Sequence, residues 1–253
     1  MSEPTKTIEG WYALHDFRQF NWPAWKAADP ADRESALVEW RALSQSHREL
    51  ASNGQGGYGA FTIAGHKADL LWLHFRPTLS ELTEAKTAFS RTRLADFTTT
   101  PYSYVSIVEL SSYLAQPGVP PDDDPKLLPR LHPNPPASAS ICFYPMNKRR
   151  EGVDNWYMLD MQKRIELMRQ HGLIGREYAG KVSQVITGSM GLDDWEWGVT
   201  LYADDPLQFK KLIYEMRFDE TSARFAEFGP FYVGQSATDE DIIRQLTIET
   251  RSL

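Results

Sequence analysis

The sequence predicts an α+β fold built from two tandem ferredoxin-like units, each with the element order β-α-β-β-α-β. Three observations support this prediction: a proline-rich stretch divides the chain, strand and helix periods alternate on both sides of it, and the order found before it is repeated after it. Of the 16 prolines, 8 lie between Pro117 and Pro136, where they favour an extended, irregular linker. We therefore divide the chain into an N-terminal half (1–113), a linker (114–138) and a C-terminal half (139–253).

The first half begins and ends with a predicted strand. Its predicted elements, in chain order, are a strand at 10–17, a helix at 23–50, strands at 59–65 and 68–75, a helix at 81–91 and a strand at 102–110. The two central segments, GAFTIAG and ADLLWLHF, alternate like a pair of strands. These elements complete one β-α-β-β-α-β unit.

The second half repeats this order. Its predicted elements are a strand at 140–146, a helix at 160–171, strands at 182–189 and 195–203, a helix at 206–217 and a strand at 229–234. Gly172 can end the first helix in the left-handed conformation, and Pro206 suits the first turn of the second helix.

Composition excludes several classes of protein. The chain has 253 residues, with 27 Lys and Arg against 34 Asp and Glu, so the net charge of −7 argues against a nucleic-acid partner. The N-terminus does not look like a signal peptide, and no apolar run approaches the roughly 20 residues that span a bilayer. We therefore expect a soluble, cytoplasmic protein without a membrane partner. The single cysteine, Cys142, excludes an internal disulfide and any multi-cysteine metal site.

His171 is the most notable of the six histidines because of its position. It ends a predicted helix whose apolar stripe is marked by Met161, Ile165 and Met168, and it lies about 80° from that stripe, at its edge. A histidine there can point into a groove between helix and sheet and bind a metal. A charged histidine favoured by the helix dipole is an equally ordinary interpretation.

Gln184 is a lone polar residue on a strand face that it shares with Val182 and Ile186. A buried amide needs a hydrogen-bond partner. That partner is either neighbouring backbone or a bound ligand.

Tyr144 and Met146 share a strand face that leads into the basic residues Lys148, Arg149 and Arg150. Such a charge run is usually a solvated loop, but in an acidic protein it can also bind a carboxylate-bearing substrate. Sequence spacing cannot show whether more distant groups converge on it. Further candidates for anion contacts are Arg130, Arg217 and Ser222.

Residues 144–234 contain the long motifs YPMNKRREGVDNWYML, MRQHGLIGREYAGKVSQVITGSMG and DDWEWGVTLYADDPLQFKKLIYEMRFDETSARFAEFGPFYVG. They resemble the second half of the chlorite dismutase-like haem proteins, and specifically the coproheme decarboxylases of Gram-positive bacteria. GWYALHDFR, RPTLSEL and YSYVSIVELSSYL in the first half also match. The resemblance implies two ferredoxin-like halves in a dimeric α+β barrel-type subunit, a haem or coproheme site in the C-terminal half, and a homopentamer.

The resemblance also implies residue roles. His171 would be the proximal iron ligand, Tyr144 the redox-active tyrosine beside a substrate propionate, and Lys148 a catalytic helper at another reacting propionate. Gln184 occupies the distal place over the iron, where chlorite-degrading relatives carry arginine. Asn147 stands where serine is more often found in this motif. The full set of substrate-binding residues implied by the resemblance is Arg130, Tyr144, Met146, Lys148, Gln184, Arg217 and Ser222.

The implied reaction converts iron coproporphyrin III (coproheme) into haem b. Two of the four propionates are lost by oxidative decarboxylation through a tyrosyl radical, with hydrogen peroxide as co-substrate. The resemblance leaves open whether the chain contacts the coproporphyrin ferrochelatase that supplies the iron.

Two other functions compete with this one. The first is chlorite dismutation or general haem peroxidase activity, and Gln184 counts against chlorite because a guanidinium holds an anion better than a neutral amide does. The second is non-catalytic haem binding on the same fold. Tyr144 and Lys148 count against it, because a protein that only binds haem needs neither.

Overall fold

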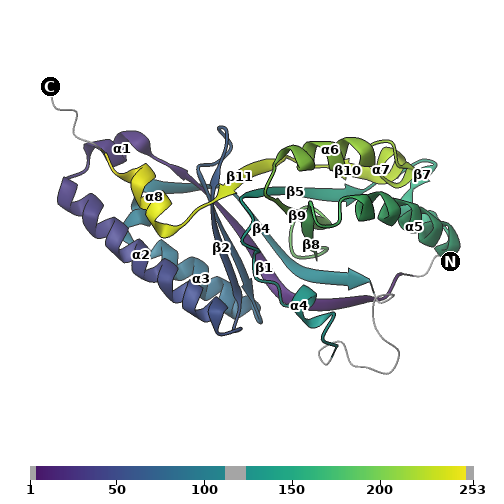
Figure 1. The fold of residues 1–253 in the computed structure, drawn as a ribbon, viewed down its shortest axis with the longest axis horizontal. Coiled ribbons are helices and arrows are strands. Elements are labelled where there is room, and N and C mark those ends of the chain that lie inside the picture. The colour runs from purple at the N-terminus through teal and green to yellow at the C-terminus, as the bar shows by residue number, and fades with distance from the viewer. Residues whose placement is uncertain (1–3, 112–123, 249–253) are drawn as a thin grey trace. The chain divides into compact units, whose positions relative to one another are not determined.

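The computed structural model describes residues 4–111 and 124–248 (Figure 1). The chain forms two compact units that do not follow chain order. Of the described residues, the amino-terminal unit comprises 11–105, 132–135 and 234–248. The carboxy-terminal unit comprises 4–10, 106–111, 124–131 and 136–233, and it contains every predicted site residue.

The amino-terminal unit is an antiparallel sheet with helices packed on it. Its strands, in spatial order, are β11 (Tyr232–Ser236), β2 (Gly57–Ile63), β3 (Leu70–Arg76), β1 (Thr7–Phe20) and β4 (Thr98–Ser111). Its helices are α1 (Trp22–Ala27), α2 (Pro30–Ser52), α3 (Leu79–Ser90) and α8 (Asp239–Leu246), with a 3₁₀ turn at Arg93–Phe97. The core between sheet and helices is aromatic: Trp25 and Trp40 are fully buried, and the Trp40 and Trp72 rings are stacked with centroids 5.4 Å apart.

The helix predicted over residues 23–50 is in fact two helices, and that prediction was wrong. α1 ends at Ala27, and Pro30 begins α2 because proline suits the first turn of a helix and cannot continue one. Asp29 caps the new helix by accepting a hydrogen bond from the Ala31 amide at 2.9 Å. The Arg33 guanidinium donates a hydrogen bond to the carbonyl oxygen of Ala28, the C-cap residue of α1, at 2.6 Å.

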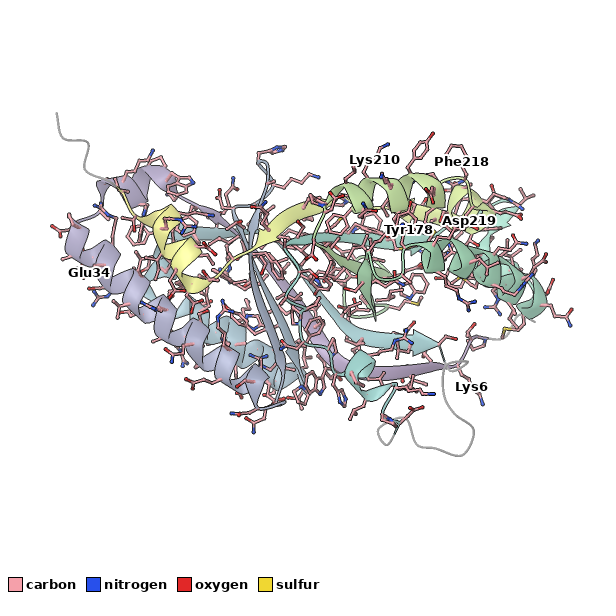
Figure 2. The ribbon with its side chains drawn as sticks, in the orientation of Figure 1. Lys6, Glu34, Tyr178, Lys210, Phe218 and Asp219 are labelled. Atoms are coloured by element: carbon pink, nitrogen blue, oxygen red, sulfur yellow. The ribbon has the colours of Figure 1, made fainter. Side chains whose placement is uncertain are left out.

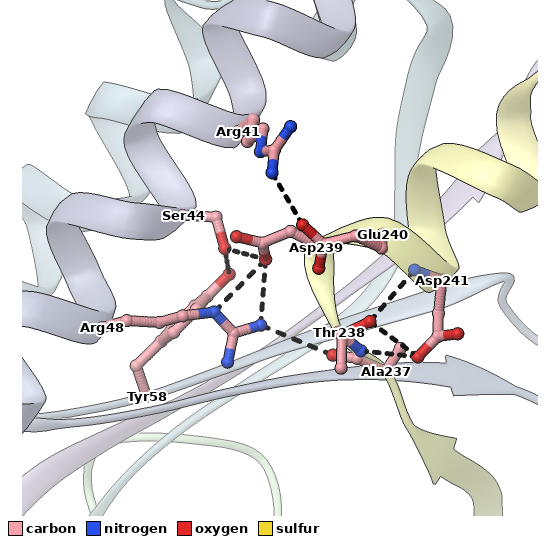
Figure 3. Close-up of polar contacts among 9 residues, drawn as sticks. All are labelled: Arg41, Ser44, Arg48, Tyr58, Ala237, Thr238, Asp239, Glu240 and Asp241. Carbon is pink, nitrogen blue, oxygen red and sulfur yellow. Dashed lines mark hydrogen bonds and ion pairs between the residues drawn. The ribbon is translucent and has the colours of Figure 1, made fainter.

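α8, which the sequence did not predict, is held against α2 by a polar network (Figure 3). The carboxylate of Asp239 accepts hydrogen bonds from Ser44 at 2.7 Å and from Arg48 at 2.9 Å. Thr238 and Asp241 form a capping box at the start of α8. Long-range hydrogen bonds therefore fix a helix of only eight residues.

The carboxy-terminal unit also consists of antiparallel strands and helices. Its strands are β4, β8 (Ser183–Gly188), β9 (Trp197–Ala203), β5 (Ser140–Lys148) and β10 (Ala226–Phe228), in that spatial order. Its helices are α4 (Leu128–Leu131), α5 (Met161–Glu177), α6 (Leu207–Met216) and α7 (Glu220–Phe225). A small hairpin, β6 (Arg150–Glu151) with β7 (Asp154–Asn155), and a 3₁₀ turn at Trp156–Met158 link β5 to α5.

α5 differs from the prediction in two ways. It continues six residues past His171 to Glu177, and Gly172 lies inside it rather than ending it in the left-handed conformation. The stripe marked by Met161, Ile165 and Met168 was also wrong as a core face: Ile165 is 43% exposed and Met168 is 46% exposed. The side of α5 that faces the core carries Arg164 and Leu167 instead.

The predicted α+β class and the repeated β-α-β-β-α-β order are confirmed. α7 and β10 are additions between α6 and the last strand, and the described part of the predicted linker contains the short helix α4. Of the helices in the described ranges, none is long and apolar enough to cross a membrane.

His47 on α2 contacts Arg76 and His74, and the geometry of its contact with Arg76 determines which ring nitrogen carries no proton. Its Nδ1 lies 3.1 Å from Nη2 of Arg76, and because a guanidinium can only donate, Nδ1 must accept and carry no proton. The His47 and His74 rings are 4.8 Å apart. Burial, reinforced by Arg76, lowers the pKa of His47 to about 4, and burial lowers the pKa of His74 well below its ordinary value.

We predict that the free energy of unfolding falls between pH 6.5 and pH 4, because the unfolded chain binds protons there that folded His47 excludes. His47→Gln keeps an oxygen acceptor for Arg76 but does not titrate. Between pH 7 and pH 4.5 this variant should lose about 2 kcal/mol less stability than the wild type in denaturant titrations. An identical pH dependence in the two proteins would contradict the assignment.

Candidate functional site

Strand register places four of the predicted residues, Tyr144, Met146, Lys148 and Gln184, on one sheet face of the carboxy-terminal unit. Tyr144 of β5 is paired with Val199 of β9, which is paired with Ile186 of β8, so these three side chains lie in one row. Gln184 lies in the next row of the same face, opposite Leu201. The predicted alternation of β8 is correct, but Gln184 is exposed rather than buried, so it needs no partner within the chain.

Tyr144 is buried among aromatic rings at the centre of this face. Its ring is stacked on Phe231 with centroids 4.6 Å apart and is tilted against Phe228 at 5.6 Å. The guanidinium of Arg217, at the end of α6, lies 3.8 Å from the Phe228 ring centroid. Burial raises the pKa of Tyr144, so the phenol stays protonated at neutral pH, while nearby Arg217 opposes this shift. The site therefore holds a neutral phenol away from water.

The basic run after Tyr144 separates into two paired arginines and one lysine. Arg149 lies 4.0 Å from the carboxylate of Asp154, and Arg150 lies 3.7 Å from that of Glu196. Both arginines lie beyond the end of β5, whereas Lys148 is the last residue of that strand. Of the three predicted basic residues, Lys148 is therefore the one that shares the strand face of Tyr144.

Lys148 is placed to meet an anion. Its ammonium lies 4.3 Å above the Trp156 ring, a favourable cation–π geometry. Burial lowers the pKa of Lys148 to about 8, and the carboxylates of Asp219 and Glu196 oppose that shift. A carboxylate arriving beside Lys148 would stabilise the charged form.

His171 is oriented by a carboxylate that the sequence motifs did not single out. Its Nδ1 lies 2.8 Å from Oδ2 of Asp219, a residue that follows α6 and precedes α7 (Figure 2). The side chain of Asp219 is 2% exposed and that of His171 is 31% exposed. Because the carboxylate accepts, Nδ1 must carry the proton, and this leaves the lone pair of Nε2 available to a metal.

Ser222 is connected to His171 through the same carboxylate. Asp219 caps α7, and its Oδ2 accepts a hydrogen bond from the Ser222 amide at 3.2 Å. Ser222 is itself buried. The predicted iron ligand and a predicted propionate anchor are therefore tied to one buried acidic residue.

Two predicted residues stand differently. Met146 is the last residue of β5 that pairs with β9, where it lies opposite Trp197, and on the other edge it lies opposite Phe228 of β10. Arg130 is exposed on α4, and within residues 4–111 and 124–248 no hydrogen bond or ion pair joins it to another predicted site residue. Asp219 thus links predicted residues of α5 and α7, and strand register groups those of β5 and β8, whereas Arg130 has no such link within the described residues.

The functional residues that the sequence patterns missed are Asp219, Trp156 and Glu196. Asp219 precedes a helix with the D-x-x-S spacing of an N-cap, which is a local signal for a cap and not for a histidine 48 residues away. Trp156 and Glu196 lie within the family motifs of residues 144–234, but their sequence spacing from Lys148 does not predict a contact with it.

Some apolar side chains of α5 and β8 are exposed. Ile165 and Met168 of α5 are 43% and 46% exposed, and Ile186 of β8 is 37% exposed. Within the described part of the chain, no group of three or more His, Cys, Asp or Glu side chains could hold a bare metal ion. His171 alone could therefore supply one ligand to a metal whose other ligands come from a cofactor, as in a haem protein.

Comparison with known proteins gives a consistent family. Residues 33–237 match the family model described as chlorite dismutase. A haem-binding protein from Thermus thermophilus is 50% identical, with a TM-score of 0.92 over 97% of this chain and 98% of that one. A mutant chlorite dismutase from Candidatus Nitrospira defluvii is 21% identical, with a TM-score of 0.76 over 94% of this chain and 96% of that one. The same enzyme bound to imidazole is 20% identical, with a TM-score of 0.75 over 94% and 95% of the two chains.

We predict that Asp219→Asn weakens the binding of ferric haem at least about tenfold, because an amide does not strengthen the histidine as a ligand in the way that a carboxylate does. Asparagine caps helices as well as aspartate does, so the fold should persist. The measurement is an absorbance titration with ferric haem.

Asp160→Asn is the matched control for this variant. Asp160 caps α5 by accepting from the Lys163 amide at 2.8 Å, so the change removes the same charge from another N-cap. Equal haem affinities for the two variants would remove Asp219 from any role at the metal.

Proposed function

The chain belongs to the chlorite dismutase family, and from that membership we propose that it converts iron coproporphyrin III into haem b with hydrogen peroxide. The observation that supports the proposal is that Tyr144, Lys148 and the His171–Asp219 pair lie in the same unit. Tyr144 and Lys148 share a face of β5, four residues apart, and Asp219, the partner of His171, acts electrostatically on Lys148.

The residues present suit an iron porphyrin with acidic side chains. Nε2 of His171 can bind the iron, and the exposed apolar side chains of α5 and β8 suit the flat ring. Lys148 and Arg217 supply cations for the propionates. The 50% identity to a haem-binding protein from Thermus thermophilus supports haem binding by this chain.

The proposed chemistry removes a carboxyl group and one hydrogen from each of two propionates. For each, RCH₂CH₂COO⁻, H₂O₂ and H⁺ give RCH=CH₂, CO₂ and two H₂O. Peroxide, reacting at the iron of the bound substrate, supplies the oxidising power. The chain must hold each reacting propionate, exclude water and provide a relay between the ring and the propionate β-carbon.

Tyr144 is the proposed relay. Its phenol can give up an electron and a proton together to the peroxide-oxidised substrate and then take a hydrogen atom from the β-carbon. The resulting carbon radical passes a second electron to the same oxidised substrate as CO₂ leaves and the vinyl group forms, which completes the two-electron reduction of the peroxide. Burial keeps this phenol protonated, and stacking on Phe231 holds the ring in one orientation. Lys148 is proposed to bind the other reacting propionate, because its ammonium lies over a ring in a site whose burial disfavours an unpaired charge, and a carboxylate there would compensate it.

Gln184 favours decarboxylation over chlorite chemistry. Its exposed, neutral amide on the sheet face can donate a hydrogen bond but brings no charge to hold an anion such as chlorite. The homopentamer, the cytoplasmic location and a contact with the ferrochelatase remain predictions from the resemblance.

We predict that purified protein mixed with iron coproporphyrin III and peroxide yields a product lighter by two carboxyl groups and two hydrogens, as measured by mass spectrometry. Unchanged porphyrin together with rapid oxygen release from chlorite would favour chlorite dismutation. Unchanged porphyrin with tight haem binding and no turnover would favour a binding protein.

Tyr144→Phe should bind iron coproporphyrin III normally and melt within a few degrees of the wild type, because only a hydroxyl is lost. The first decarboxylation should fall at least about 100-fold, since phenylalanine cannot relay a hydrogen atom. The measurement is chromatographic product analysis after peroxide addition.

The matched control is Tyr178→Phe, which removes a hydroxyl from another buried tyrosine of the same core cluster (Figure 2). This variant should form haem b at the wild-type rate. Normal haem b formation by Tyr144→Phe would refute the proposed relay.

A further inference from the structure

The last residues of β5 are held by side chains where the strand ladder stops. Pairing between β5 and β9 ends at Met146 and Trp197. Beyond that pair, the Asn147 side-chain oxygen accepts a hydrogen bond from the Glu196 amide at 2.8 Å, and Oε2 of Glu196 accepts one from the Lys148 amide at 2.8 Å. These two reciprocal bonds extend the pairing by side chains, and we call them the Asn147–Glu196 bracket.

The bracket holds the backbone of Lys148 at the end of β5. On its other edge β5 pairs with β10, where Lys148 is opposite Ala226, so Lys148 is fixed from both sides. Because strand side chains alternate between faces, this extended backbone places Lys148 on the face of Tyr144. A frayed strand end would free the lysine to turn toward solvent.

Glu196 also removes a competing cation. Its Oε1 lies 3.7 Å from Nη1 of Arg150, whose side chain is 64% exposed. The side chain of Glu196 is only 11% exposed, and a buried carboxylate is costly unless it is paired and hydrogen-bonded. The same carboxylate therefore accepts a hydrogen bond from the Lys148 backbone and pairs with the Arg150 guanidinium.

We propose that Glu196, acting through the Asn147–Glu196 bracket, is a positioning residue that directs Lys148 toward a substrate carboxylate. This inference rests on the proposed function, because it assigns Lys148 to a propionate that the substrate has and the product haem b lacks. It explains why asparagine suits position 147: its side-chain carbonyl accepts the Glu196 amide hydrogen bond.

The test compares two ligands that differ in the groups that react. Affinities for iron coproporphyrin III and for haem b are measured by absorbance titration for the wild type, Glu196→Ala, Lys148→Ala and the double variant. Glu196→Ala should weaken coproporphyrin binding about tenfold and leave haem b binding within about twofold, and Lys148→Ala should do the same. The double variant should match Lys148→Ala alone, because Glu196 acts through the lysine.

Three further variants separate positioning from general damage. Glu196→Gln retains an oxygen for the Lys148 amide and should recover most of the coproporphyrin affinity. Asn147→Ala removes the other half of the bracket and should show the same selective loss even if Glu196→Ala folds poorly. Glu227→Ala is the matched control, because Glu227 is an exposed carboxylate of β10 opposite Asn147 and should leave both affinities unchanged.

Equal losses for both ligands in Glu196→Ala and Asn147→Ala would overturn the inference, and so would an unchanged preference in these variants when Lys148→Ala shows a clear loss. If Lys148→Ala itself leaves the preference for iron coproporphyrin III unchanged, the assignment of Lys148 to a propionate fails. Formation of haem b by the wild type, measured separately, then shows whether the proposed function survives without that assignment.

Discussion

The register of β5 between β9 and β10 is the constraint on which the candidate site depends. Seven consecutive pairs, from Ser140 opposite Ala203 to Met146 opposite Trp197, fix it on one side, and pairs with β10 fix it on the other. A slip of one residue would turn Tyr144 and Lys148 to the opposite face, because strand side chains alternate. The aromatic packing of Tyr144 and the bracket at Lys148 both require the observed register.

The buried carboxylate of Asp219 then positions the groups next to this face. Asp219 is almost fully buried, and its cost is offset by the His171 ring, the Ser222 amide and the nearby Lys148 cation. One carboxylate thus orients the proposed iron ligand, caps α7 and supports the lysine. Because these tasks share one group, we expect substitutions at Asp219, His171 and Lys148 to combine non-additively.

Periodicity predicted most elements because amphipathic strands and helices must each bury one face. Periodicity failed where a single residue interrupts the pattern, or where a contact between residues distant in sequence determines the structure. Pro30 splits the long helix, whereas α5 continues through Gly172 to Glu177 and is followed by the buried Tyr178. The apolar stripe of Ile165 and Met168 looks the same in sequence whether a core or a flat ligand is to cover it. Asp219 meets His171, and Glu196 meets Lys148, across 48 residues in each case, a separation that no local pattern encodes.

The central claim is that one face of the carboxy-terminal unit binds iron coproporphyrin III between His171 and the residues of β5. The crystal structure of the wild-type chain with that porphyrin tests it most directly. We expect Nε2 of His171 to bind the iron while Nδ1 keeps its hydrogen bond to Asp219. We also expect one propionate at the Lys148 ammonium and another beside the Tyr144 phenol. Iron bound by a different residue, or a porphyrin whose propionates lie away from both Tyr144 and Lys148, would contradict the claim.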